Sequence, residues 1–188
     1  QRVVHALALY LAESEHALTN ADVVDDLLML DGPIYPTGLL GWADRESELA
    51  DLLAEDDRPK TVVGNYIELV ETFVERDVPL VGFIKNSSAK GLTRAVRRKT
   101  NAPWVDDNAF FRRILERRDD GGDLRTGALS CTNWFRSRGG TDAVMAADGS
   151  ALGIDRDLDP ELYEVTFFVV YDPRTDLVFR VEAPYAFT

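Results

Sequence analysis

Apolar positions recur along the chain in two patterns, one helical and one extended. Between Thr61 and Glu75 they fall three or four residues apart, which predicts a helix with one buried face. Short apolar runs bounded by turn residues, such as Leu80–Ile84, predict buried strands. The predicted helices are 2–18, 39–54, 61–75, 90–100 and 106–118, and the predicted extended segments are 23–30, 80–84, 127–135, 163–171 and 177–183.

The order of these elements predicts the fold class. Helices are interspersed with single strands at first, and three extended segments end the chain, the last two joined by a hairpin turn at 172–176. Such an order indicates an α/β fold in which helices flank a mixed β-sheet. The segment 136–160, rich in Gly, Asp and Arg, is predicted to be a long loop.

Length and composition agree with one domain of ordinary size. Of the 188 residues, 45% are hydrophobic and 10% aromatic, so the chain can bury a core and is not disordered throughout. No apolar run approaches the ~18–20 residues that span a bilayer, and no signal peptide is evident, so we expect a cytoplasmic protein with no membrane partner. The single cysteine, Cys131, excludes an internal disulfide and a cysteine-based zinc site.

The charge pattern has two informative features, an acidic overall composition and a basic stretch in the middle of the chain. The formal net charge is −12, with 21 Asp against 12 Glu and 17 Arg against four Lys. This bias favours a salt-loving host, because molar salt screens charges beyond about 3 Å; an ordinary acidic protein is the alternative. Between Lys85 and Lys99, however, the chain carries six basic residues and no acidic one, which is typical either of a solvated helix face or of a surface that follows DNA.

Two charged residues end predicted strands. Asp31 follows the apolar end of 23–30, and Lys85 follows LVGFI at 80–84. Open α/β folds place their sites at the carboxyl ends of strands, so Asp31 is a candidate ligand and Lys85 a candidate phosphate contact. The structural alternatives are a turn-forming aspartate before Gly-Pro and a lysine at the edge of the sheet.

The first helix carries two further acidic candidates, Glu13 and Glu15. A buried carboxylate needs a partner or a metal, but periodicity alone does not choose between these two, and both could be exposed in the last turns. The only histidines, His5 and His16, are 11 residues apart, about 16 Å along a helix, so they cannot share a metal. A nucleophilic triad and a phosphate-binding glycine loop are not indicated.

Several motifs, taken in order, resemble the NurA nuclease family of archaea. They are MLDGP (29–33), LVGFIKNS (80–87), a basic helix, DDNAFF (106–111) and FRVEAP (179–184). The resemblance implies an RNase H-like core and a 5′-to-3′ nuclease that uses Mn²⁺, with Mg²⁺ as the other candidate. It also implies action on DNA ends in double-strand break repair and homologous recombination, as a homodimer that works with a hexameric HerA-type ATPase.

The resemblance also assigns roles to residues. It makes Asp31 and Glu13 metal ligands, with Glu15 as the substitute for Glu13, and places Lys85 at the reacting phosphate. Asp106, Arg180 and Glu182 match further positions of the family pattern. The basic residues expected to contact DNA are Lys85, Lys90, Arg94, Arg97 and Arg180.

Two parts of the family pattern are missing. The family has an Asp-Gly-Ser turn upstream of the aspartate matched by Asp31 and a histidine-bearing helix after the motif matched by FRVEAP. The letters Asp148-Gly149-Ser150 occur only after Asp31, and we interpret them as a turn. We therefore expect the sequence to be a piece of a longer protein, and we expect this piece alone to have little nuclease activity.

Two alternatives to a nuclease are also consistent with the sequence. The chain could be a non-catalytic RNase H-like module that docks on a ring ATPase through 37–54 and 163–183. It could also be a small-molecule α/β enzyme with a pocket beside Asp31, although no motif names its substrate.

Overall fold

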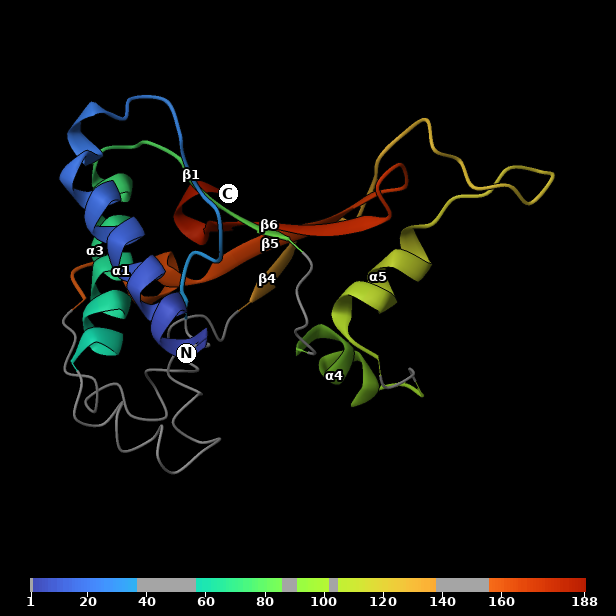
Figure 1. The fold of residues 1–188 in the computed structure, drawn as a ribbon, viewed down its shortest axis with the longest axis horizontal. Coiled ribbons are helices and arrows are strands. Elements are labelled where there is room, and N and C mark those ends of the chain that lie inside the picture. The colour runs from blue at the N-terminus through green and yellow to red at the C-terminus, as the bar shows by residue number, and fades with distance from the viewer. Residues whose placement is uncertain (1, 37–56, 86–90, 102–104, 138–155) are drawn as a thin grey trace. The chain divides into compact units, whose positions relative to one another are not determined.

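A computed structural model describes residues 2–36, 57–85, 91–101, 105–137 and 156–188 and contains a mixed six-stranded sheet with flanking helices (Figure 1). The α-helices are α1 (Arg2–Thr19), α3 (Arg58–Glu75), α4 (Gly91–Arg97) and α5 (Asp107–Leu115). The strands are β1 (Leu28–Leu30), β2 (Leu80–Lys85), β3 (Ser130–Cys131), β4 (Phe135–Ser137), β5 (Val165–Asp172) and β6 (Leu177–Pro184). Short 3-10 helices are η1 (Ala21–Val23), η3 (Pro160–Tyr163) and η4 (Tyr185–Phe187).

The strand order β1-β2-β6-β5-β3, with β4 also paired to β5, makes the sheet mixed. Strands β1 and β2 are parallel, with Leu30 opposite Gly82, and α3 is the crossover between them. Strands β3 and β5 are antiparallel, with Cys131 opposite Val170. The turn after β5 makes the expected hairpin with β6, and Asp176 there has a positive φ of 56°. The predicted α/β class is confirmed, and the arrangement is consistent with an RNase H-like fold.

The chain divides into two compact units. The first unit comprises Gln1–Gly82, Arg136–Thr166 and Ala183–Thr188. Helices α1 and α3 lie side by side in it (Figure 1). The apolar face predicted for 61–75 is buried there: Val62, Tyr66, Val70 and Phe73 are each at most 1% exposed. Burial of this face explains why α3 forms, since the packing of an apolar stripe stabilises most helices in proteins.

The second unit comprises Phe83–Phe135 and Phe167–Glu182 and has its own apolar core. Phe111 and Leu115 of α5 pack in this core with Phe167 and Val169 of β5 and with Val178 of β6. The core extends into aromatic contacts: Phe111 lies edge-on to Phe135, and Phe135 stacks on Phe167. The second unit is therefore stabilised by its own contacts between α5 and the hairpin.

Some predicted bounds differ from the structure. The strand predicted at 23–30 is confined to Leu28–Leu30. Val23 is 76% exposed in η1, and Asp25 and Asp26 are also exposed. The residues before Leu28 therefore lack the alternation of buried and exposed side chains that is typical of a half-buried strand. The segment predicted as extended at 127–135 pairs only at Ser130–Cys131 and again from Phe135. The helix predicted at 39–54 lies outside the described residues, as does most of the loop predicted at 136–160.

Two helices end earlier than predicted. Helix α4 stops at Arg97 instead of Thr100 because each residue from Arg94 to Thr100 is exposed, so no burial stabilises another turn. Helix α5 stops at Leu115, its last buried residue, and Arg118 pairs with Leu124 in an antiparallel bridge. Among the described residues, no helix has both the length and the apolar character needed to cross a bilayer.

Candidate functional site

Helix α1 positions Glu13 at the border of its buried face. Leu7, Ser14 and Ala17 lie on the buried side and are 3%, 0% and 8% exposed. Glu13 precedes Ser14 and is partly buried, so its carboxylate lies at the rim of the contact between α1 and α3. A carboxylate there is held by protein donors and can still be reached from solvent.

The main chain after β1 contacts this carboxylate directly. Oε1 of Glu13 accepts a hydrogen bond from the backbone N–H of Asp31, with N and O 3.3 Å apart. Asp31 is exposed and immediately follows Leu30, which is 2% exposed and anchors the end of the strand. Position 32 is buried and packs close to Tyr10, since a Cβ at Gly32 would lie 3.6 Å from Tyr10 Cε1. The structure therefore brings together Glu13 and Asp31, two of the expected site residues.

Tyr66 of α3 contacts the second oxygen of Glu13. Its hydroxyl donates to Oε2 at 2.5 Å, and the tyrosine is 1% exposed. The pKa of Tyr66 is raised, first by burial and then by the hydrogen bond to Glu13. Burial, followed by the charge of Glu13, also raises the pKa of Tyr10. Both tyrosines are therefore neutral at physiological pH, and Tyr66 serves as a hydrogen-bond donor to Glu13.

An adjacent hydrogen bond fixes the register between the two helices. Nδ2 of Asn65 donates to Oγ of Ser14 at 3.0 Å, and Ser14 in turn donates to the carbonyl oxygen of Leu11. Residues 13 and 14 of α1 thus pair with residues 66 and 65 of α3. Because Ser14 is fully buried, a shift between the helices would leave polar groups without partners.

The donor set around Glu13 and Asp31 suits a hard divalent cation. Each carboxylate oxygen of Glu13 accepts one protein hydrogen bond and can accept a second interaction. Cations such as Mg²⁺ bind one or two carboxylates and complete their coordination with water and substrate phosphate, and Mn²⁺ also prefers oxygen ligands. Within the described ranges, no three His, Cys, Asp or Glu side chains form a metal-binding group.

The other acidic candidate on α1 faces solvent. Glu15 is exposed, and its backbone carbonyl accepts a hydrogen bond from Oγ1 of Thr19. It lies two residues after Glu13, which is about 200° around a helix, so the two side chains point in different directions. Of the two glutamates, Glu13 is the one that contacts Asp31.

Three of the expected DNA contacts lie in the second unit or at its first strand and are exposed. Lys85 is the last residue of β2, and Arg94 and Arg97 belong to α4. Lys90 lies outside the described residues. Exposure lets long basic side chains contact a phosphate backbone without a large desolvation cost.

Arg180 and Glu182 on β6 form an ion pair. Nη2 of Arg180 lies 2.8 Å from Oε2 of Glu182, and Glu182 is 3% exposed. The guanidinium also lies over the ring of Phe167, 5.4 Å from its centroid. Glu182 thus holds Arg180 in place, and Arg180 offers a phosphate only those donors that Glu182 does not use.

Asp106 and Asp107 have structural roles at the start of α5. Asp106 is the N-cap, and its Oδ1 accepts from the backbone N of Ala109 at 2.7 Å. Asp107 is buried and accepts from the backbone N of Leu92 at 3.1 Å and of Thr93 at 2.8 Å, at the start of α4. These bonds satisfy donors that a helix start leaves unpaired.

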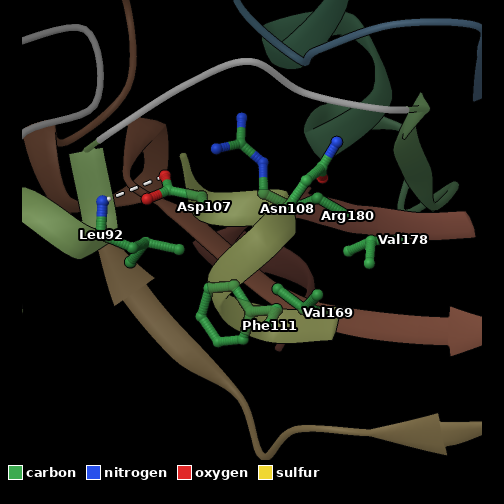
Figure 2. A pocket seen from close by; sticks show the side chains of 7 residues that line it. All are labelled: Leu92, Asp107, Asn108, Phe111, Val169, Val178 and Arg180. Carbon is green, nitrogen blue, oxygen red and sulfur yellow. Dashed lines mark hydrogen bonds between the residues drawn. The ribbon is translucent and has the colours of Figure 1, made fainter. Parts of the chain in front are cut away.

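A small hollow lies beside these residues in the second unit (Figure 2). It has a volume of about 20 Å³, enough for a water molecule but not for a nucleotide. Figure 2 shows Asp107 at its border, bonded to the backbone N of Leu92. The lining residues are Leu92, Asp107, Asn108, Phe111, Val169, Val178 and Arg180. This hollow does not by itself provide a substrate pocket.

Tyr66 was not predicted as part of this site, because in the sequence it counts only as an apolar position of the helix at 61–75. A signal was present: a buried tyrosine needs a partner for its hydroxyl, and the other large residues of that stripe are aliphatic or phenylalanine. The partner itself could not be named, since it lies 53 residues away in the chain.

Comparison with known proteins identifies the family. No curated protein and no solved structure matches the chain. The family model described as the NurA domain matches residues 5–188. Since this match includes the helix that carries Glu13, the turn at Asp31 and both strands of the final hairpin, the chain belongs to the NurA family.

Proposed function

We propose that this protein is a metal-dependent deoxyribonuclease in which Glu13 and Asp31 bind the divalent cation. Membership of the NurA family indicates nuclease activity in general. The observation that carries the specific proposal is the hydrogen bond from the backbone N–H of Asp31 to Oε1 of Glu13, which joins two acids from distant elements at one place. Mn²⁺ is the proposed cation, with Mg²⁺ as the alternative, because both prefer oxygen ligands.

The chain's own residues would perform two tasks in hydrolysis of the phosphodiester. Glu13 and Asp31 hold the cation, and Tyr66 and the turn after β1 hold Glu13. A divalent cation bound there would neutralise charge on the phosphate and activate water. This mechanism of hydrolysis requires neither a histidine nor a nucleophilic serine.

Exposed basic residues are proposed to bind the DNA backbone. Lys85, Arg94 and Arg97 are exposed and suit phosphate contacts that do not depend on base sequence. Arg180 is proposed to make a weaker contact, since Glu182 already occupies part of its guanidinium. Such contacts position the DNA and make its binding depend on salt.

A biological setting is proposed on the basis of the family resemblance. We place the enzyme in the processing of DNA ends for double-strand break repair, as a homodimer in the cytoplasm that acts with a HerA-type hexameric ATPase. The corresponding test is co-purification of the full-length protein with that ATPase, followed by measurement of the mass of the complex.

The activity itself is tested by cleavage of labelled DNA. Full-length wild-type protein and Asp31→Ala are compared with Mn²⁺, with Mg²⁺ and with a chelator. We expect cation-dependent cleavage by the wild type and no cleavage by Asp31→Ala. Equal rates would remove Asp31 from the mechanism. No cleavage by the wild type would favour the non-catalytic module that docks on a ring ATPase.

A further inference from the structure

We propose that Tyr66 is a positioning residue, whose hydroxyl holds the carboxylate of Glu13 in the orientation that binds the divalent cation. This inference rests on the proposed function, because it assigns a task to Tyr66 within the same site. Tyr66 has no ionic charge at physiological pH, and the sequence indicated it only as part of the core.

The hydroxyl of Tyr66 is committed to Glu13 by burial. Tyr66 is 1% exposed, and its oxygen lies 2.5 Å from Oε2 of Glu13. A buried hydroxyl without a partner carries the full cost of desolvation. The bond between Tyr66 and Glu13 is therefore a persistent feature of the fold and constrains where the carboxylate can lie.

The two oxygens of Glu13 are held from two sides. Asp31 N–H donates to Oε1, and Tyr66 O–H donates to Oε2. Together the two donors restrict the torsions of a long side chain that would otherwise lose considerable rotamer entropy on binding a cation. Each oxygen keeps a lone pair for the cation. Groups that orient a metal ligand in this way commonly strengthen metal binding.

The aromatic ring of Tyr66 is anchored independently of its hydroxyl. It meets the ring of Tyr10 edge-on, with centroids 6.2 Å apart and planes at 76°. The neighbouring bond from Asn65 to Ser14 holds α3 against α1. Tyr66→Phe should therefore remove the donor and preserve the packing, which makes it a clean test of the hydroxyl.

The chain offers a matched control in Tyr163. Like Tyr66, it is 1% exposed, and its hydroxyl donates to a glutamate, Glu71. It also accepts a hydrogen bond from the backbone N of Leu158 at 2.9 Å. Tyr163→Phe thus removes the same kind of buried interaction within the same unit, at a glutamate other than Glu13. A general loosening of the fold would affect both variants.

The experiment measures Mn²⁺ binding directly, by the decrease of the electron paramagnetic resonance signal of free Mn²⁺ during titration of the purified protein. Wild type, Asp31→Ala, Tyr66→Phe and Tyr163→Phe are compared. The rise in melting temperature on addition of Mn²⁺ is measured for each protein against its own metal-free form, so that altered stability cancels. Circular dichroism confirms that each variant is folded.

We expect Tyr66→Phe to weaken Mn²⁺ binding about 10- to 100-fold, and Tyr163→Phe to bind as the wild type does. Wild-type affinity in Tyr66→Phe, together with abolished binding in Asp31→Ala, would overturn the inference and leave the proposed function standing. Equal weakening in both tyrosine variants would also overturn it. Equal binding by wild type and Asp31→Ala would reject the proposed metal site, and the inference with it.

Discussion

The backbone N–H of Asp31 donates to the carboxylate of Glu13 across a separation of 18 residues. This bond ties the end of β1 to the later turns of α1. The turn that carries Asp31 is thereby fixed against Glu13. These are the two residues proposed to share a cation. A carboxylate held in this way loses less conformational entropy when it binds a metal.

The choice between the two glutamates of α1 gives the first prediction. Glu13→Gln keeps the size of the side chain but removes its charge, so we expect Mn²⁺ affinity to fall by at least about tenfold. Glu15→Gln is the matched control, because Glu15 is exposed on the same helix, and we expect it to bind Mn²⁺ as the wild type does. Isothermal titration calorimetry measures both. A larger decrease in Glu15→Gln would show that the wrong glutamate has been assigned.

The acids at the start of α5 should affect stability and not metal binding. Asp106→Ala removes an N-cap and should lower the free energy of unfolding by about 1 kcal/mol. Asp107→Ala leaves two backbone N–H groups, of Leu92 and Thr93, without their acceptor and should cost about 1–3 kcal/mol. Urea unfolding measures the stability, and calorimetry the Mn²⁺ affinity. A drop in Mn²⁺ affinity in Asp106→Ala with unchanged stability would contradict a capping role.

Stability at high pH should depend on Tyr163. Burial, and next the hydrogen bond to Glu71, raise the pKa of Tyr163 from 10.0 to about 12. Between these values the unfolded tyrosine releases its proton while the folded one keeps it. The contribution of this group is therefore complete below pH 10 and is lost as the pH rises towards 12, by about 1.4 kcal/mol per pH unit.

Tyr163→Phe removes this contribution. Urea unfolding from pH 8 to 11.5 should show that the variant loses stability with pH less steeply than the wild type does. The wild-type slope includes other tyrosines with raised pKa, Tyr10 and Tyr66 among them, so the prediction concerns the difference between the slopes. Identical slopes would show that Tyr163 is not protected from ionisation by the fold.

The exposed arginines of α4 should control the salt dependence of DNA binding. In the double variant Arg94→Ala/Arg97→Ala, we expect the slope of log K against log salt concentration to fall by about one unit for each phosphate that the protein no longer neutralises. Arg174→Ala is the control, because Asp172 holds the Arg174 guanidinium through two hydrogen bonds. Fluorescence anisotropy at several salt concentrations measures the slope. An unchanged slope in the double variant would remove α4 from the DNA surface.

Much of the fold was predictable because its elements have strong local signals. The stripe at 61–75 indicated a buried helix, and the helix predicted from residue 106 is observed with Asp106 as its N-cap. The strand at 23–30 was predicted too long because an apolar run does not reveal which of its residues find a partner strand. Only Leu28–Leu30 pair with β2. Strand length depends here on a contact with residues about 50 positions away, not on local composition.

The candidate site was only partly predictable for the same reason. The end of β1 indicated Asp31, since its position follows from local sequence. The choice of Glu13 over Glu15 required the packing of α1 on α3, which turns Leu9 to solvent at 68% exposure and buries Ala17. Tyr66 joins the site through a contact with Glu13, 53 residues away, and the local sequence does not name that partner. The residues that bind could be proposed from the sequence, but those that position them could not.

Glu13 and Asp31 are proposed to bind one divalent cation between them. Crystals of the protein soaked in Mn²⁺ reveal such a cation by anomalous diffraction recorded at the manganese absorption edge. We expect an anomalous peak bonded to a carboxylate oxygen of Glu13 and to one of Asp31, and we expect this peak to disappear in crystals of Asp31→Ala. A saturating Mn²⁺ soak that gives no peak at these two side chains, or a peak that persists in Asp31→Ala, would contradict the claim.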